Sequence, residues 1–288
     1  MKVLVLGASG MIGSAMISVL SDLSDYEVWG TVRDEKVKKF FASSISNNLK
    51  INVNLEKNDI LLKMLKQISP DVIINCAGLT KHKMEVDDPL ITIPINTLMP
   101  HRLAKLCNLI GARLIHISTD CVFSGEKGEY LESDFADARD LYGKSKALGE
   151  INYPNAITLR TSTIGHELNS AYGLLEWFLS KEKRCNGYSR VIFSGVPTIV
   201  LAQIIGDFVI PNKALSGTYH VSSKPINKYE LLKLIAKVYG KSIQIIEDDS
   251  LVLDRSLNSD KFHAATGYVT PEWLELIRIM YNYKQNVK

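Results

Sequence analysis

The chain has 288 residues, of which 46% are hydrophobic, so it can bury a sizeable core, and its net charge of +3 gives no reason to expect binding to nucleic acid or to a membrane surface. Its four cysteines show neither paired nor metal-ligand spacing, so they predict reduced thiols in the cytoplasm and no metal site. The N-terminus runs directly into an apolar segment and no stretch reaches the roughly 18 apolar residues of a membrane span, so neither secretion nor membrane insertion is predicted.

The first strand, turn and helix predict a dinucleotide site. The apolar run of residues 2–6 stops at Gly7, and apolar residues then recur at helical spacing as far as Leu20. Residues 7–13 have the pattern G-x-x-G-x-x-G, which lets backbone N–H groups approach a pyrophosphate at a helix N-terminus. The alternative is a plain glycine-rich turn. We assign cofactor contacts here to Gly7, Ser9, Gly10, Met11 and Ile12.

The next two predicted strands point to the adenosine end of that cofactor. Residues 27–32 form the second strand, and Arg33 follows it, twenty residues beyond Gly13. An arginine at this place can pair with the 2′-phosphate of NADP, so we expect NADPH to be preferred over NADH, although Asp34 follows at once. A third strand is predicted at residues 51–54, where Asn54 would pass the adenine ring. The helix after it is expected to have Asn58 as its N-cap and to end before Pro70.

Residues 71–76 predict a buried strand that closes in small residues beside the cofactor, namely Cys76, Ala77 and Gly78. Lys81 and His82 follow on a loop at the carboxyl edge of the sheet, where they are either solvated or in contact with substrate. Asn96 is predicted to cap a helix from about residue 97 to 110.

The remaining elements define the fold class. A fifth strand at residues 113–117 leads into Ser118 and Thr119, whose hydroxyls are expected to point into the crevice where α/β folds bind ligands. Strands and helices alternate four times before residue 142, which predicts an α/β protein with a Rossmann-type doubly wound parallel sheet. We assign residues 1–161 to an NADP-binding Rossmann domain and residues 162–288 to a smaller substrate lobe, from which strands and helices return to the Rossmann domain.

The later elements are predicted as a sixth strand at 156–160, helices at 172–181 and 198–210, a strand at 217–221, a helix capped by Asn227 and ended by Gly240, a strand at 242–246 and a last helix from Pro271.

Tyr142 and Lys146 are four residues apart on a predicted helix. At that spacing they share one face, with Cβ atoms about 5–6 Å apart. An ammonium beside a phenol favours the phenolate, so we expect the pKa of Tyr142 to be lowered and Tyr142 to act as an acid or base. A solvated helix face is the alternative.

The glycine turn, the strand-end Ser/Thr and the Tyr-x-x-x-Lys pair, in this order, resemble the extended short-chain dehydrogenase/reductases. Residues 118–125 (STDCVFSG), 142–150 (YGKSKALGE) and 159–165 (LRTSTIG) are similar to the dTDP-4-dehydrorhamnose reductase branch. This resemblance implies NADPH-dependent reduction of a 4-keto group on a nucleotide-linked deoxysugar, for the synthesis of cell-surface polysaccharide precursors. The chain departs from the branch at Cys121, where a tyrosine is usual, and at Asn54, where an aspartate is usual.

The resemblance also implies the roles of individual residues. Tyr142 would donate a proton to the developing alkoxide, Thr119 would hold the oxygen, and Lys146 would lower the tyrosine pKa and grip the nicotinamide ribose. Asn96 would support Lys146 through water. Arg255 would lie near the pyrophosphate, with a salt bridge to a neighbouring Asp or a helix cap as its alternatives. Further substrate contacts are assigned to Lys81 and Asp120.

Other functions stay open at this point. Sugar-nucleotide 4,6-dehydratases resemble one another in an Asp-Glu pair after the threonine, whereas Asp120 is followed here by Cys121. Epimerases need no such pair. The regulatory subunit of methionine adenosyltransferase also resembles this branch, so a catalytically silent NADP-binding subunit is a third alternative. The oligomeric state is open, with a homodimer as one alternative.

Overall fold

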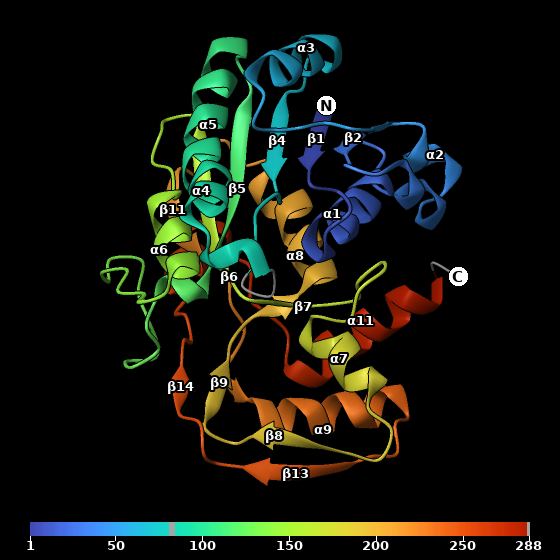
Figure 1. The fold of residues 1–288 in the computed structure, drawn as a ribbon, viewed down its shortest axis with the longest axis vertical. Coiled ribbons are helices and arrows are strands. Elements are labelled where there is room, and N and C mark those ends of the chain that lie inside the picture. The colour runs from blue at the N-terminus through green and yellow to red at the C-terminus, as the bar shows by residue number, and fades with distance from the viewer. Residues whose placement is uncertain (81–83, 287–288) are drawn as a thin grey trace.

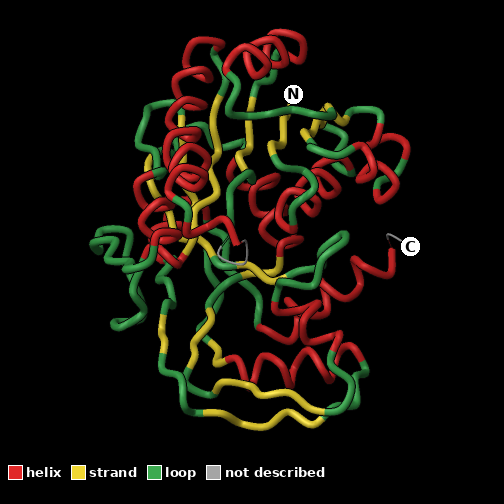
Figure 2. The backbone as a smooth tube through the Cα atoms, viewed as in Figure 1, coloured by secondary structure: helices red, strands yellow, loops and turns green. Residues whose placement is uncertain are grey.

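The computed structural model describes residues 1–80 and 84–286 and is built on a seven-stranded sheet (Figures 1 and 2). The strand order is β11-β6-β5-β4-β1-β2-β3, and every neighbouring pair is parallel. This confirms the predicted doubly wound parallel sheet. The strands are β1 (Lys2–Leu6), β2 (Glu27–Thr31), β3 (Leu49–Lys50), β4 (Val72–Asn75), β5 (Arg113–Thr119), β6 (Ala156–Thr161) and β11 (Gly217–His220).

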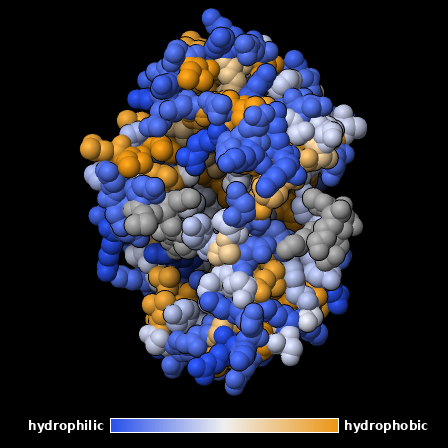
Figure 3. All heavy atoms as spheres, turned by 45° about the vertical axis from the view of Figure 1, so that its right-hand side comes forward, coloured by the Kyte–Doolittle hydropathy of each residue, from blue (hydrophilic) through white to orange (hydrophobic). Residues whose placement is uncertain are grey.

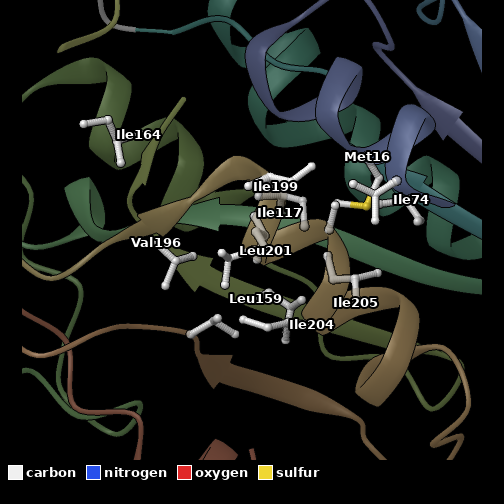
Figure 4. Close-up of a cluster of buried hydrophobic side chains, with 14 of the residues drawn as sticks. Met16, Ile74, Ile117, Leu159, Ile164, Val196, Ile199, Leu201, Ile204 and Ile205 are labelled. Carbon is white, nitrogen blue, oxygen red and sulfur yellow. The ribbon is translucent and has the colours of Figure 1, made fainter. Parts of the chain in front are cut away.

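Helices cover both faces of the sheet because successive strand residues point to opposite sides. In β1, Val3 and Val5 belong to one apolar cluster, whereas Leu4 and Leu6 belong to another. The first cluster includes α1 (Met11–Ser21), α8 (Thr198–Ile204) with its continuation η5 (Ile205–Val209), and α11 (Trp273–Asn286). Figure 4 shows its centre, where Met16 meets Ile74, Ile117 and the side chains of α8.

The opposite face of the sheet packs against α3 (Asn58–Ile68) and α5 (Met99–Ile110). The helical segment before α5 consists of η2 (Met84–Asp87), α4 (Pro89–Thr92) and η3 (Ile93–Leu98), and α6 (Leu141–Leu148) contacts η3 and β5. The short elements η1 (Glu35–Phe40) and α2 (Ser43–Ser46) lie between β2 and β3, and η4 (Asp120–Val122) follows β5.

The C-terminal part forms a smaller group of elements below the sheet in Figure 1. Its helices are α7 (Leu174–Ser180) and α9 (Lys228–Tyr239), whereas α10 (Asp260–Thr266) packs against β11 of the main sheet. Its strands pair as β7 (Thr163–Ile164) with β10 (Val196–Pro197), as β8 (Arg184–Tyr188) with β13 (Gln244–Asp248), and as β9 (Val191–Phe193) with β12 (Ile226–Asn227) and β14 (Leu253–Asp254). Since β11 and α8 come from this half of the chain yet pack in the upper layers, the domain boundary after residue 161 stays a prediction.

Two local expectations for residues 51–58 were wrong. The third strand lies at Leu49–Lys50, before the predicted residues 51–54, because Asn52 has a φ of 56° and turns the chain out of the extended conformation. Asn58 is the first residue of α3, and its N-cap is Lys57. The cap of α9 is confirmed, since Asn227 Oδ1 accepts a hydrogen bond of 2.8 Å from Glu230 N–H and Gly240 ends the helix with a φ of 63°.

The surface and the helix lengths bear on membrane association. Figure 3 shows a face on which apolar side chains occur in separate groups among hydrophilic ones. Among the described residues, no helix combines the length and the apolar character that crossing a bilayer would require.

Candidate active site

The β1–α1 turn has the geometry of an anion site. Gly7 has a φ of +79°, and a Cβ at Gly13 would lie 2.1 Å from the carbonyl oxygen of Gly7, so only glycine fits where α1 meets the turn. Gly10 is the N-cap of α1 and offers no side-chain cap to the first N–H groups of the helix. These N–H groups, together with the helix dipole, favour a bound anion at Met11 and Ile12.

Arg33 and Asn54 lie on the β2 and β3 side of this turn. The Arg33 side chain is exposed, and within the described residues it forms no hydrogen bond or ion pair. The side chain of Asp34 caps the next turn of the chain, since its Oδ1 accepts a 2.9 Å hydrogen bond from Lys36 N–H. Asn54 Oδ1 likewise accepts from Glu56 N–H at 2.9 Å, in the turn before α3. Their contacts with a cofactor stay predictions.

The end of β4 lies directly against the glycine turn. A Cβ at Gly7 would approach the backbone nitrogen of Ala77 to 3.0 Å. Ala77 N–H donates to Asn75 Oδ1 at 3.2 Å, and Asn75 Nδ2 is 3.1 Å from His116 Nδ1 in the sheet interior. Because an amide nitrogen is a donor, His116 Nδ1 accepts this bond and its proton is on Nε2. The segment of Cys76, Ala77 and Gly78 is therefore fixed beside the predicted pyrophosphate site.

Asn96 does not cap a helix, contrary to the prediction, because it lies inside η3, a π-helical segment that joins α4 to α5. Its Oδ1 accepts from Leu79 N–H at 2.9 Å, and its Nδ2 donates to Leu79 O and to Ser145 Oγ, both at 3.2 Å. Asn96 thus ties the segment after β4 to the helix that carries Tyr142 and Lys146. Its direct contact with cofactor stays a prediction.

Thr119 and Asp120 lie at the carboxyl end of β5. Thr119 Oγ1 accepts from Cys121 N–H at 3.1 Å and donates to Asp120 Oδ1 at 3.0 Å. Thr119 also forms a hydrogen bond with the phenol of Tyr142. This bond lowers the pKa of the phenol, as a hydroxyl that donates to the phenolate does.

The expected lowering of the Tyr142 pKa is wrong. Burial raises the pKa of Tyr142, and the neighbouring Cys121 raises it further, against an opposing effect of the hydrogen bond to Thr119. The ammonium that was expected to lower this pKa points elsewhere, since Lys146 Nζ donates to Ile117 O at 2.8 Å. Tyr142 is therefore protonated at neutral pH, as a proton donor must be.

Lys146 is buried between α6 and the sheet. Burial lowers its pKa to about 8, whereas the carboxylate of Glu150 acts in the opposite direction. After Glu150, the thiol of Cys76 is the second acidic group whose charge would favour the Lys146 ammonium. Burial raises the pKa of that thiol to about 12, so it is uncharged at neutral pH.

Ser118 does not point into a ligand site as expected. Its Oγ donates to Glu150 Oε1 at 2.8 Å, and the same carboxylate receives two bonds from Arg160, from Nε at 2.8 Å and from a terminal nitrogen at 2.7 Å. No role was predicted for Glu150 or Arg160. The available signal was the spacing of Glu150, one helical turn beyond Lys146.

Arg255 follows β14 and reaches back to the segment after β5. Its Nε donates to Phe123 O at 2.8 Å, and a terminal nitrogen lies 3.6 Å from Cys121 Sγ. Asp254 instead accepts from Ser256 N–H, and within the described residues Arg255 forms no ion pair. The structure thus brings Thr119, Asp120, Tyr142, Lys146 and Arg255 to the region around η4. Lys81 and His82 lie outside the described residues.

The comparison with protein families decides the affiliation. The profile of the RmlD substrate binding domain family matches residues 1–282. The chain belongs to this family. The predicted resemblance to the dTDP-4-dehydrorhamnose reductase branch is thereby confirmed.

Individual relatives in and around the family are distant. A dTDP-4-dehydrorhamnose reductase of Aggregatibacter actinomycetemcomitans is 26% identical over 234 residues, 78% of this chain and 74% of the relative. The β subunit of methionine adenosyltransferase 2 of Rattus norvegicus is 26% identical over 252 residues, 83% of this chain and 72% of the relative. The crystal structure of the Bacillus anthracis dTDP-4-dehydrorhamnose reductase in complex with NADP has a TM-score of 0.79 at 21% identity, covers 98% of this chain and is itself covered to 99%. This last similarity shows the fold.

Proposed function

We propose that the protein reduces a 4-keto group on a nucleotide-linked deoxysugar with NADPH, in the synthesis of cell-surface polysaccharide precursors. The observation that carries this proposal is the hydrogen-bonded pair of Thr119 and Tyr142, one helical turn from the buried Lys146, in a chain of the RmlD family. Its relatives include dTDP-4-dehydrorhamnose reductases.

The β1–α1 turn fits a dinucleotide. A Cβ at Gly7 or Gly13 would meet backbone atoms, and the first turn of α1 has no side-chain cap, so a pyrophosphate can approach these N–H groups. Gly7, Ser9, Gly10, Met11 and Ile12 would hold it, with Cys76, Ala77, Gly78 and Asn96 beside the nicotinamide half. When bound, NADPH supplies the hydride for the ketone carbon.

The protein's own part in the reaction is proton transfer and charge stabilisation. Tyr142, protonated at neutral pH, gives its proton to the alkoxide oxygen, and Thr119 hydrogen bonds to the same oxygen. Lys146, with a pKa of about 8, is mainly cationic at neutral pH and binds the nicotinamide ribose.

Two charged residues are assigned to the substrate. Arg255 forms no ion pair within the described residues, which supports contact with the phosphates of the nucleotide over a salt bridge to Asp254. Asp120 has a carboxylate beside Thr119 that can accept from a sugar hydroxyl. Lys81 stays a prediction.

The decisive experiment is an activity assay. Purified protein would be incubated with NADPH and a panel of nucleotide-linked 4-keto deoxysugars, including the dTDP sugar, and NADPH absorbance would be followed. We expect oxidation of NADPH with at least one sugar. Conversion of a sugar to its epimer without net consumption of NADPH would indicate an epimerase instead.

The methionine adenosyltransferase relative gives a second candidate, a catalytically silent NADP-binding subunit. Retention of Thr119, Tyr142 and Lys146 at one site favours the enzyme. Tight NADPH binding without turnover on any sugar of the panel would favour the silent subunit.

Arg33 is expected to select NADPH. Replacing it by alanine removes the charge that we assign to the 2′-phosphate, and we expect NADPH affinity to fall about 10- to 100-fold with little change for NADH, since a charge-assisted hydrogen bond contributes roughly 1.5–3 kcal/mol. Fluorescence titration measures both affinities. Arg184→Ala, which removes an exposed arginine on β8, is the matched control. Equal losses for the two cofactors would rule out this role of Arg33.

The cellular setting is also a proposal. We place the protein in the cytoplasm, because none of its four cysteines, all within the described residues, forms a disulfide. The homodimer stays a prediction.

A further inference from the structure

A buried ion pair lies directly behind the Tyr142 helix. The side chains of Glu150 and Arg160 are only 11% and 8% exposed. Burying two opposite charges costs desolvation free energy, and a pair of well-packed apolar residues often stabilises a fold as well or better. The stability of the fold therefore gives no sufficient reason for a charged pair at this place.

The pair connects the two elements that carry the proposed catalytic groups. α6, which carries Tyr142 and Lys146, ends at Leu148 with Gly149 as its C-cap, and the carboxylate of Glu150 then contacts Ser118 on β5 and Arg160 on β6. Lys146 Nζ donates to Ile117 O on the same strand. Two successive residues of β5, immediately before Thr119, are thus bonded to α6 and to the residue just beyond its C-cap, and these bonds set Thr119 relative to Tyr142.

Glu150 also differs in charge from the other groups around Lys146. Cys76 faces Lys146 from the end of β4, and His116 faces it from β5. Burial keeps both groups neutral near pH 7, because it raises the pKa of Cys76 to about 12 and lowers the pKa of His116. Tyr142, on the same helix, is protonated as well. Among these described groups Glu150 is the one anion, and its carboxylate is paired with Arg160.

We propose that Glu150 is a positioning residue for Lys146 and Tyr142: its carboxylate, held by Ser118 and Arg160, fixes α6 on the sheet and keeps the buried Lys146 ammonium charged. Arg160 holds this carboxylate in place with two hydrogen bonds. The part of this inference that concerns turnover rests on the proposed function, whereas the part that concerns the charge of Lys146 does not.

The test replaces both charges at once, because removing one partner of a buried pair leaves the other unpaired and can unfold the chain. In the double variant Glu150→Gln/Arg160→Met neither partner of the ion pair is left alone. For wild type we expect NADPH binding and turnover to weaken above about pH 8, where Lys146 loses its proton. In the double variant this alkaline limb should begin at lower pH, and a displacement of one pH unit would place turnover at pH 8 roughly fivefold below wild type.

Glu126 and Arg139 supply the matched control, because they form an exposed ion pair of 2.6 Å. Glu126→Gln/Arg139→Met should leave the alkaline limb in place. Glu150→Asp, which keeps the charge but shortens the side chain, should lower turnover without moving the limb, and it also tests the proposal if the double variant fails to fold. A limb at the wild-type pH in a folded double variant, or wild-type turnover in Glu150→Asp, would overturn the proposal.

NADPH affinity as a function of pH is measured without any sugar, so the two proposals can fail separately. If wild type turns over no sugar but the alkaline limb of NADPH binding moves in the double variant, the reductase proposal fails and the role of Glu150 in keeping Lys146 charged stands. If wild type reduces a sugar but the alkaline limb of NADPH binding does not move in the double variant, the reductase proposal stands and the proposed role of Glu150 fails.

Discussion

Replacing Tyr142 by phenylalanine is expected to lower kcat by roughly 10²- to 10⁴-fold, the usual contribution of a general acid. Burial together with nearby Cys121 raises the pKa of Tyr142, so its phenol is protonated at neutral pH, and the substitution deletes only this hydroxyl. The ring remains to fill its place on α6. We therefore expect the melting temperature and the NADPH affinity to stay close to wild type.

Tyr153→Phe is the matched control for this experiment. Tyr153 is also half-buried, and its hydroxyl lies 3.3 Å from His101 Nδ1, away from the groups assigned to the reaction. Its removal should leave kcat within about twofold of wild type. A Tyr142→Phe variant with near-wild-type turnover would show that another group supplies the proton.

The parts of the fold that the sequence predicted well are those set by local patterns. The turn at Gly7 and Gly13 could be predicted because its requirement for glycine arises within a few residues of chain. The buried strands β4 and β5 each have a short apolar core, residues 72–74 and residues 114–115, and the cap of α9 by Asn227 is a local hydrogen bond. Each of these was placed to within one or two residues.

The errors arose where distant segments decide the structure. Asn96 looked like a helix cap, but Leu79 and Ser145, 17 and 49 residues away, occupy its side chain. The expected effect of Lys146 on Tyr142 relied on helical spacing alone, whereas the carbonyl of Ile117, 29 residues from Lys146, directs the ammonium elsewhere. Spacing along one helix predicts which side chains are neighbours, but it does not predict what the rest of the fold offers them.

The ion pair of Glu150 and Arg160 extends to the C-terminal half of the chain through His220. A terminal nitrogen of Arg160 lies 3.3 Å from His220 Nε2, and His220 Nδ1 lies 3.1 Å from the carbonyl oxygens of both Tyr130 and Asn258. Because carbonyl oxygens only accept, Nδ1 carries the proton and Nε2 accepts from Arg160. A second proton on this ring would therefore face a guanidinium in the protein interior.

This arrangement predicts that the protein loses stability in mild acid. Burial lowers the pKa of His220 from its ordinary value of 6.5 to about 4, and the charge of Arg160 contributes in the same direction. Below pH 6.5 the unfolded chain binds a proton at this histidine, whereas the folded chain binds it only near pH 4. The contribution of His220 to the free energy of unfolding is therefore fully present above pH 6.5 and is lost as the pH falls. We expect the free energy of unfolding to decrease by about 2 kcal/mol from this residue between pH 7 and pH 5.

Urea unfolding of wild type and of His220→Gln at pH 7 and pH 5 measures this contribution. Glutamine has a donor and an acceptor but no proton to gain, so the variant should be less stable than wild type at pH 7 yet should lose about 2 kcal/mol less between the two pH values. Carboxylates and His116 titrate in both proteins, and their effect cancels in the difference. His263→Gln, which replaces an exposed histidine on α10, should keep the wild-type pH dependence. If His220→Gln and wild type lose the same free energy, His220 is not the group that the folded protein keeps neutral.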